Sequence, residues 1–143
     1  MKVELLAVHI ENRLDRLAAI AELLAGNGIN IRTLFFADTA GAGLLQILVN
    51  DIVRANDLLR AAGHETSRTE VLVLEVPDRP GGLATVLNSL ENTALTVQYI
   101  HAYSQKSGES GLLIFGFDDP DKAANALRLH GIRILSAEEV DAL

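Results

Sequence analysis

An internal repeat constrains the fold of this chain more than any other feature of its sequence. Shifted by 66 positions, the segment Leu6–Leu24 falls on Leu72–Leu90. Five residue types then coincide, those of Leu6, Arg13, Leu17, Ala18 and Leu24. After two extra residues in the second copy the offset becomes 68, and Arg60 falls on Arg128. The repeat predicts two copies of one supersecondary unit, 1–69 and 70–143.

The best-defined stretch of the repeat is VLVLEVPDRPGGLATV, which begins at Val71. Its first half alternates in hydropathy, as a strand with one buried face does. The turn 78–82 follows, and apolar residues then recur at helical spacing, at Leu83, Val86, Leu87 and Leu90. We therefore predict a strand, a tight turn and a helix of about residues 80–92, with Pro80 at its first position.

The same reasoning gives each copy the element order βαββαβ. In the first copy the strands are 2–10, 29–36 and 44–49, and the helices follow Arg16 and the N-cap Asp51. Residues 64–74 must hold the last strand of the first unit and the first strand of the second. The second copy continues with a strand 95–102, a loop 104–110, a strand 112–117, a helix capped by Asp119, a strand 133–135 and a solvated acidic end at Glu138–Glu139.

Right-handed crossovers place both helices of a βαββαβ unit on one face of an antiparallel sheet. The predicted fold class is therefore α+β, with two ferredoxin-like units. A unit of about 65 residues buries only roughly 60% of its unfolded surface, so each unit should share an interface with another.

Composition excludes several classes of function. The formal net charge of −7 disfavours nucleic acid and anionic membranes as partners. The chain has no cysteine, and its N-terminus shows neither a signal peptide nor a membrane span. We expect a cytoplasmic protein that binds no metal and no cofactor, and that is not an enzyme, because no nucleophile or metal-ligand pattern is evident. The alternating Tyr99, His101 and Tyr103 should pack in an interface or a small-molecule pocket.

The two strand-to-helix turns remain as candidate sites. The first backbone N–H groups of a helix have no partner within it and attract an anion such as a carboxylate. Asp78, or Asn12 in the first copy, would then hold or orient an ammonium group. The alternative is that both are simply well-formed turns, with Asp78 capping the helix.

These motifs, VPDRPGGLATVL in the second copy and IENRLDRLAAI followed by GINI in the first, resemble the ACT domain family. The resemblance covers nearly the whole chain and is to tandem ACT proteins without a catalytic domain. It implies a regulatory, amino-acid-binding protein with the ligand between ACT units, and a homodimer. A regulatory subunit of an amino-acid biosynthetic enzyme and a structural oligomerisation module are the alternatives.

The resemblance also implies which residues contact the ligand. They are the turn residues and the starts of the following strands: Asn12, Arg13, Asn30, Ile31, Asp78, Arg79, Pro80, Gly81, Gly82, Leu83, Thr96 and Val97. The turns should be unequal, because the first copy has Leu14-Asp15 in place of Pro80-Gly81, and a carboxylate at Asp15 would repel an anionic ligand. We expect the turn 78–83 to be the better site, completed by Asn30 and Ile31 of the other unit.

Overall fold

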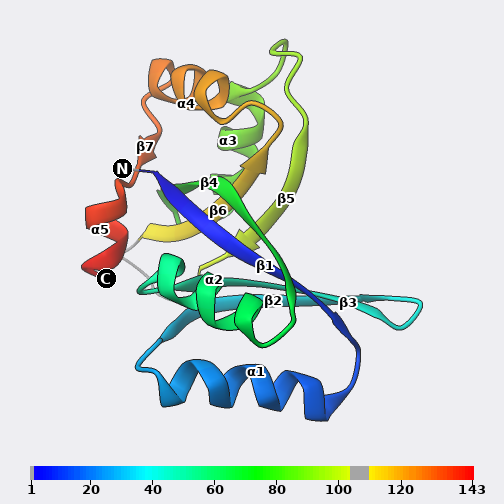
Figure 1. Ribbon diagram of the computed structural model, residues 1–143. Helices are drawn as coiled ribbons and strands as arrows, with labels where there is room; N and C mark the ends of the chain where they lie inside the picture. Colours follow the sequence, from blue (N-terminus) through cyan, green and yellow to red (C-terminus); the bar gives the residue numbers. More distant parts are fainter. Residues whose placement is uncertain (1, 104–109) are drawn as a thin grey trace. The chain divides into compact units, whose positions relative to one another are not determined.

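The computed structural model describes residues 2–103 and 110–143 (Figure 1). It contains two compact units, Glu4–Thr69 and Met1–Val3 with Glu70–Leu143, called here the first and the second unit. Strand β4 (Glu65–Pro77), 13 residues long, runs across the boundary. The predicted last strand of one unit and first strand of the next are therefore one continuous strand. The predicted loop 104–110 lies, apart from Ser110, outside the described residues.

The first unit has the predicted element order. Its strands lie in the order β2-β3-β1-β4, with β3 antiparallel to both of its neighbours. Asp51 caps α2, since its carboxylate accepts a hydrogen bond from the Arg54 N–H at 3.1 Å. The bounds are β1 (Val3–Glu11), α1 (Leu14–Gly26), β2 (Ile31–Thr39), β3 (Ala42–Val49) and α2 (Ile52–Ala61).

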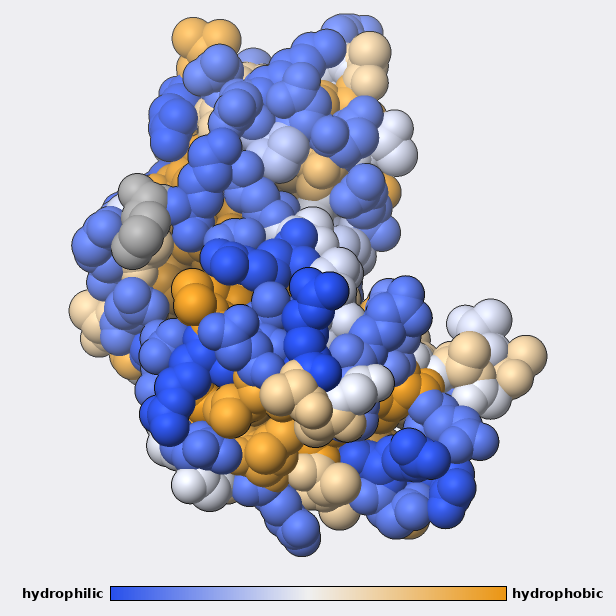
Figure 2. Space-filling model, in the orientation of Figure 1, coloured by the Kyte–Doolittle hydropathy of each residue, from blue (hydrophilic) through white to orange (hydrophobic). Residues whose placement is uncertain are grey.

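The core of the first unit lies between its sheet and its two helices. Alternate residues of β1 and β3 pack with Ile20 and Leu24 of α1 and with Leu59 of α2. Figure 2 shows apolar side chains at the surface between α1 and α2, where the packing of the two helices leaves them partly open. Both helices therefore cover the same sheet face, as predicted.

The second unit repeats this arrangement. Its strand order, β5-β6-β4-β7, is that of the first unit, and the β5–β6, β6–β4 and β4–β7 pairs are antiparallel. Figure 1 shows α3 and α4 side by side. Its core joins alternate residues of β4 and β6 to Val86 and Leu127. The bounds are α3 (Gly82–Ser89), β5 (Val97–Ala102), β6 (Ser110–Phe117), α4 (Pro120–Leu129), β7 (Arg133–Ile134) and α5 (Ala137–Asp141).

The start of α3 differs from the prediction. Gly81 has a left-handed φ of 91°, so it is the N-cap, and the helix begins at Gly82 rather than at Pro80. The predicted apolar stripe of this helix is also only partly buried. Val86 is fully buried, whereas 44% of Leu83 and 38% of Leu87 are exposed. The short α3 thus contributes little to the core, and Leu83 is left at the surface beside the turn.

The acidic end of the chain is not the predicted solvated tail. It forms helix α5, which begins with a capping box: Ser136 accepts a hydrogen bond from the Glu139 N–H, and Glu139 accepts one from the Ser136 N–H. Glu139 also pairs with Arg133, and Val140 is buried. The sequence analysis missed this helix, although the Ser-x-x-Glu pattern of a capping box is present at Ser136 and Glu139.

Candidate functional site

The turn between β4 and α3 is built on a close contact between backbone groups. The Arg79 N–H donates to the Pro77 carbonyl oxygen at 2.9 Å, and the Gly82 N–H donates to the Arg79 carbonyl oxygen at 3.1 Å. A Cβ atom on Gly82 would lie 2.3 Å from the Pro77 oxygen. Only glycine fits there, so Gly82 is required by the turn itself and not only by an approaching ligand.

The first turn of α3 presents unused hydrogen-bond donors. Among the residues that the structure describes, the N–H groups of Gly81, Leu83 and Ala84 make no hydrogen bond. The N-cap residue is Gly81, which has no side chain with which to cap the helix. Such donors at a helix N-terminus favour an anionic group.

A pocket of about 280 Å³ opens beside this turn. This volume is near the lower end of the roughly 300–1,000 Å³ of typical small-molecule sites. Asp78 and Arg79 bring charge of both signs, whereas most of the remaining wall is apolar. All the lining residues belong to the second unit: Val76, Pro77, Asp78, Arg79, Leu83, Ala102, Tyr103, Gly111, Leu112 and Leu113.

Tyr103 and Gly111 are two of the seven pocket residues that the sequence analysis did not assign to the site. They are distant from the turn in sequence and are brought to it because β4 pairs with β6, with Pro77 opposite Ser110. The signal for Tyr103 was the alternation of aromatic residues, which predicted a pocket or an interface. The other two members of this alternating set, Tyr99 and His101, stack on each other with ring centroids 5.0 Å apart.

The corresponding turn of the first unit has a different chemistry. The guanidinium of Arg13 forms two hydrogen bonds, of 3.1 and 2.9 Å, with the carboxylate of Asp15 in the first turn of α1. That carboxylate stands at the helix N-terminus, where an anionic ligand would bind. Asn12 is exposed, and Leu14 is 86% exposed. The two turns are therefore chemically unequal, and the preference of an anionic ligand for the second turn stays a prediction.

The predicted strand-start residues lie at the other end of each sheet. In the second unit Pro77 is opposite Ser110, whereas Val97 is opposite Phe117 at the far end of β6. Seven residues at about 3.3 Å each place the turn roughly 23 Å from the start of β5. Thr96 and Val97 therefore cannot contact a ligand held at the turn of their own unit.

The strand starts are also tied to their own sheets. The Asn30 N–H donates to the Asn50 side chain at 2.9 Å, and the Thr96 N–H donates to the Asp118 carboxylate at the same distance. This repeated contact occupies both backbone donors. A ligand that contacts these strand starts would have to bind their side chains or the next residues, Ile31 and Val97.

Other sites are not apparent in the described part of the chain. No group of three or more His, Cys, Asp and Glu residues there is arranged to hold a metal ion. No helix there has both the length and the apolar character needed to cross a membrane.

The fold, repeated twice around strand-to-helix turns, defines the class of tandem ACT regulatory domains. A family model described as an ACT domain pair matches residues 1–143, and the chain belongs to that family. No curated protein matches the sequence.

Solved structures share the fold of this chain. The chain is similar to protein BT0572 from Bacteroides thetaiotaomicron, with 26% identity, a TM-score of 0.91, and 100% of this chain and 98% of that chain covered. The regulatory subunit of aspartate kinase from Thermus thermophilus is 13% identical, with a TM-score of 0.65 over 91% of this chain and 93% of that one. Aspartate kinase from Clostridium acetobutylicum is 13% identical, with a TM-score of 0.53 over 90% of this chain but only 33% of the enzyme chain.

Proposed function

We propose that this protein is a non-catalytic, amino-acid-binding regulatory protein that holds its ligand at the turn 78–83. The observation that carries the proposal is the set of three unused N–H groups at the start of α3 beside a pocket of about 280 Å³. The ligand carboxylate would accept hydrogen bonds from Gly81 and Leu83. Its ammonium would face Asp78, and its side chain would enter the pocket toward Tyr103.

The expected affinity follows from the number of such contacts. A hydrogen bond to a charged group contributes about 1.5–3 kcal/mol. Two or three of them, less the cost of ordering the ligand, correspond to about −4 to −8 kcal/mol, or millimolar to micromolar dissociation constants. Affinities of that order suit a protein that senses a free metabolite.

In this proposal the strand-start residues contact only a ligand that is held at the turn of a neighbouring ACT module. Because Thr96 and Val97 are too far from the turn of their own unit, residues such as Asn30 and Ile31 would complete the site from a neighbouring ACT module. A homodimer in the cytoplasm is the assembly that we propose. The family's use of paired modules supports it.

Calorimetric titration of the full chain with the twenty amino acids tests the proposal. Asp78→Asn should weaken the best ligand about 10- to 100-fold, the equivalent of one charge-assisted hydrogen bond. Asn12→Ala changes the matching position of the first unit and serves as the control, with a much smaller effect. The proposal fails if no amino acid binds, or if the two substitutions weaken binding equally.

A regulatory subunit of an amino-acid biosynthetic enzyme is the second candidate. The likeness of the fold to the regulatory subunit of aspartate kinase favours it. Affinity purification of the tagged chain from its own cells, with and without the best amino acid, discriminates between the two. A stoichiometric enzyme partner whose retention changes with the amino acid would favour the subunit, whereas a chain recovered alone would favour the free-standing sensor.

A further inference from the structure

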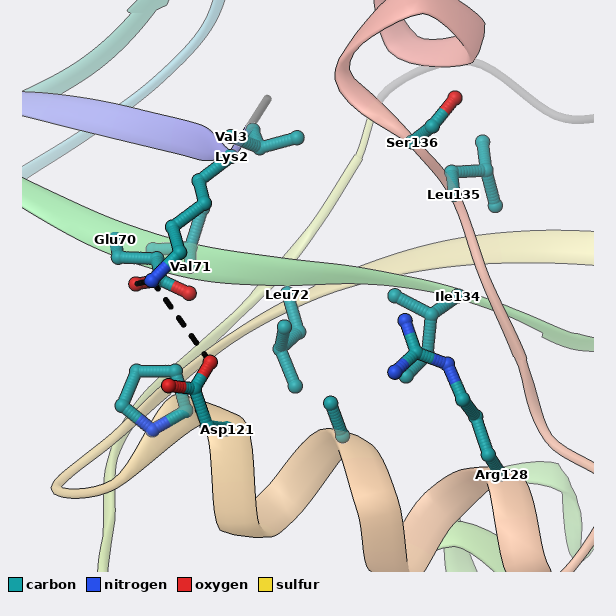
Figure 3. Close-up of a pocket in the computed structure, with 12 residues that line it drawn as sticks. Lys2, Val3, Glu70, Val71, Leu72, Asp121, Arg128, Ile134, Leu135 and Ser136 are labelled. Atoms are coloured by element: carbon teal, nitrogen blue, oxygen red, sulfur yellow. Dashed lines mark ion pairs between the residues drawn. The ribbon is translucent and has the colours of Figure 1, made fainter.

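A second pocket of about 280 Å³ lies in the second unit, away from the turn 78–83. It opens between α4 and the strands β4 and β7, around residues 70–72 in the middle of β4 rather than at its end (Figure 3). All of its lining residues belong to one compact unit. None of them belongs to the candidate site described above.

The middle of the pocket is apolar. Leu72 and Ala124 are 8% and 7% exposed, and Ile134 is half-buried beside them. Figure 3 shows Leu72 between the two charged ends of the pocket. A short hydrocarbon chain could therefore cover these side chains and release the water that they contact.

The two ends of the pocket carry opposite charge. At one end the Lys2 ammonium lies 3.0 Å from a Glu70 oxygen and 3.8 Å from an Asp121 oxygen. The pKa of Lys2 is raised, chiefly by its hydrogen bond with Glu70, so the ammonium stays protonated. One cation beside two carboxylates leaves this end with a net charge of −1.

The other end holds a cation, the guanidinium of Arg128, that has no counter-ion among the described residues. Figure 3 shows the Arg128 guanidinium projecting from α4 toward Ile134. Within residues 2–103 and 110–143 it makes no hydrogen bond or ion pair. Ser136 lines the same side, and its hydroxyl oxygen accepts from the Glu139 N–H, so its own O–H remains a donor. A guanidinium binds a carboxylate through two parallel hydrogen bonds.

We propose that this pocket binds a small organic acid with one carboxylate on a short hydrocarbon chain. The carboxylate pairs with Arg128 and the chain lies on Leu72, Ala124 and Ile134. A second carboxylate on the ligand would meet Glu70 and Asp121 and be repelled, so the site selects monoacids. Since the lining residues are distinct, binding here does not require the turn 78–83.

The probe is 4-methylpentanoate, followed by backbone amide NMR shifts of the full chain. The expected shifts centre on residues 70–72 and 134–136. Arg128→Gln should weaken binding at least about tenfold, and Arg128→Lys less, because lysine keeps the charge but loses the paired geometry. Arg60→Gln is the matched control: Arg60 holds the same place in the last turn of α2 and lies outside the pocket.

Three comparisons complete the test. The amine 3-methylbutylamine, of the same shape but opposite charge, should not produce these shifts, and Asp78→Asn should leave binding of the acid unchanged. If leucine shifts the amide signals of residues 70–72 and 134–136 as much as 4-methylpentanoate does, the result would support the site and identify an amino acid as the source of the carboxylate. The inference is overturned if Arg128→Gln binds like the wild type, if the amine binds as well as the acid, or if the shifts centre on the turn 78–83.

Discussion

The close contact under the turn 78–82 gives the sharpest test of how this site is built. Replacing Gly82 by alanine adds a methyl carbon 2.3 Å from the Pro77 carbonyl oxygen. Real Cβ contacts are essentially never shorter than 3.0 Å, so the helix start or the end of β4 must move. Both are backbone groups and cannot rotate away as a flexible side chain would.

The movement strains the hydrogen bonds of the turn. The Pro77 oxygen already accepts from the Arg79 N–H, and the Gly82 N–H donates to the Arg79 oxygen. Losing one or two such bonds, at about 0.5–1.5 kcal/mol each, destabilises the protein by roughly 1–3 kcal/mol. In a chain of this size each kcal/mol lowers Tm by about 2–4 °C, so the expected fall is about 2–12 °C.

Thermal unfolding followed by circular dichroism measures this change. Gly26→Ala is the matched control, because it also adds one methyl group to a helical glycine but meets nothing within 4 Å. It should raise stability by about 0.5–1 kcal/mol, the propensity difference between the two residues. A Gly82→Ala variant with a Tm equal to or above that of the wild type would refute the steric reasoning, and with it our account of the turn.

Three further substitutions have predictable effects on stability. Ala40 has a φ of 52° in the β2–β3 hairpin and precedes Gly41, at 84°, so Ala40→Asn, which tolerates that conformation, should raise Tm in a melting curve. The buried hydroxyl of Tyr99 has no hydrogen-bond partner among the described residues, so Tyr99→Phe should gain about 1 kcal/mol or more in urea unfolding, and a loss would imply a partner. The pKa of Glu139 is lowered, first by its hydrogen bond from the Ser136 N–H, with Arg133 contributing. Its stabilisation is therefore complete above the unfolded pKa of about 4.3 and is lost as the pH falls further. Glu139→Gln should be less stable than wild type at neutral pH, and the difference should shrink below about pH 4.3; a constant difference would contradict this.

Local patterns in the sequence were sufficient for the class of fold. Alternation marked the strands, helical spacing marked the helices, and the handedness of crossovers then allowed one sheet order for each copy. Asp51 and Asp119 were identifiable as caps because capping depends on neighbours within three residues. The predicted start of α3 was wrong because the backbone conformation of the turn overrode the local sequence pattern. Pro80 is not helical because Gly81 adopts a left-handed conformation.

The residues that line the candidate pocket could not be predicted from such local patterns. Asp78 and Gly82 are only four positions apart in the sequence, and their turn could be predicted from residue types alone. Tyr103 and Gly111 join them only because β4 and β6 pair in one particular register. A pairing of strands more than 30 residues apart depends on which faces are buried, and no short window of sequence contains that information.

The sequence by itself determined that this chain is a repeated βαββαβ unit with two unequal turns, because those properties depend on periodicity and on nearest neighbours. Tertiary structure decided which donors remain unused and which residues surround them. The N–H groups of Asn30 and Thr96 donate to side chains about twenty positions away, whereas those of Gly81 and Leu83 meet no acceptor in the described part of the chain. The physical reason is that a hydrogen-bond donor is available to a ligand only when the folded chain brings it no acceptor of its own.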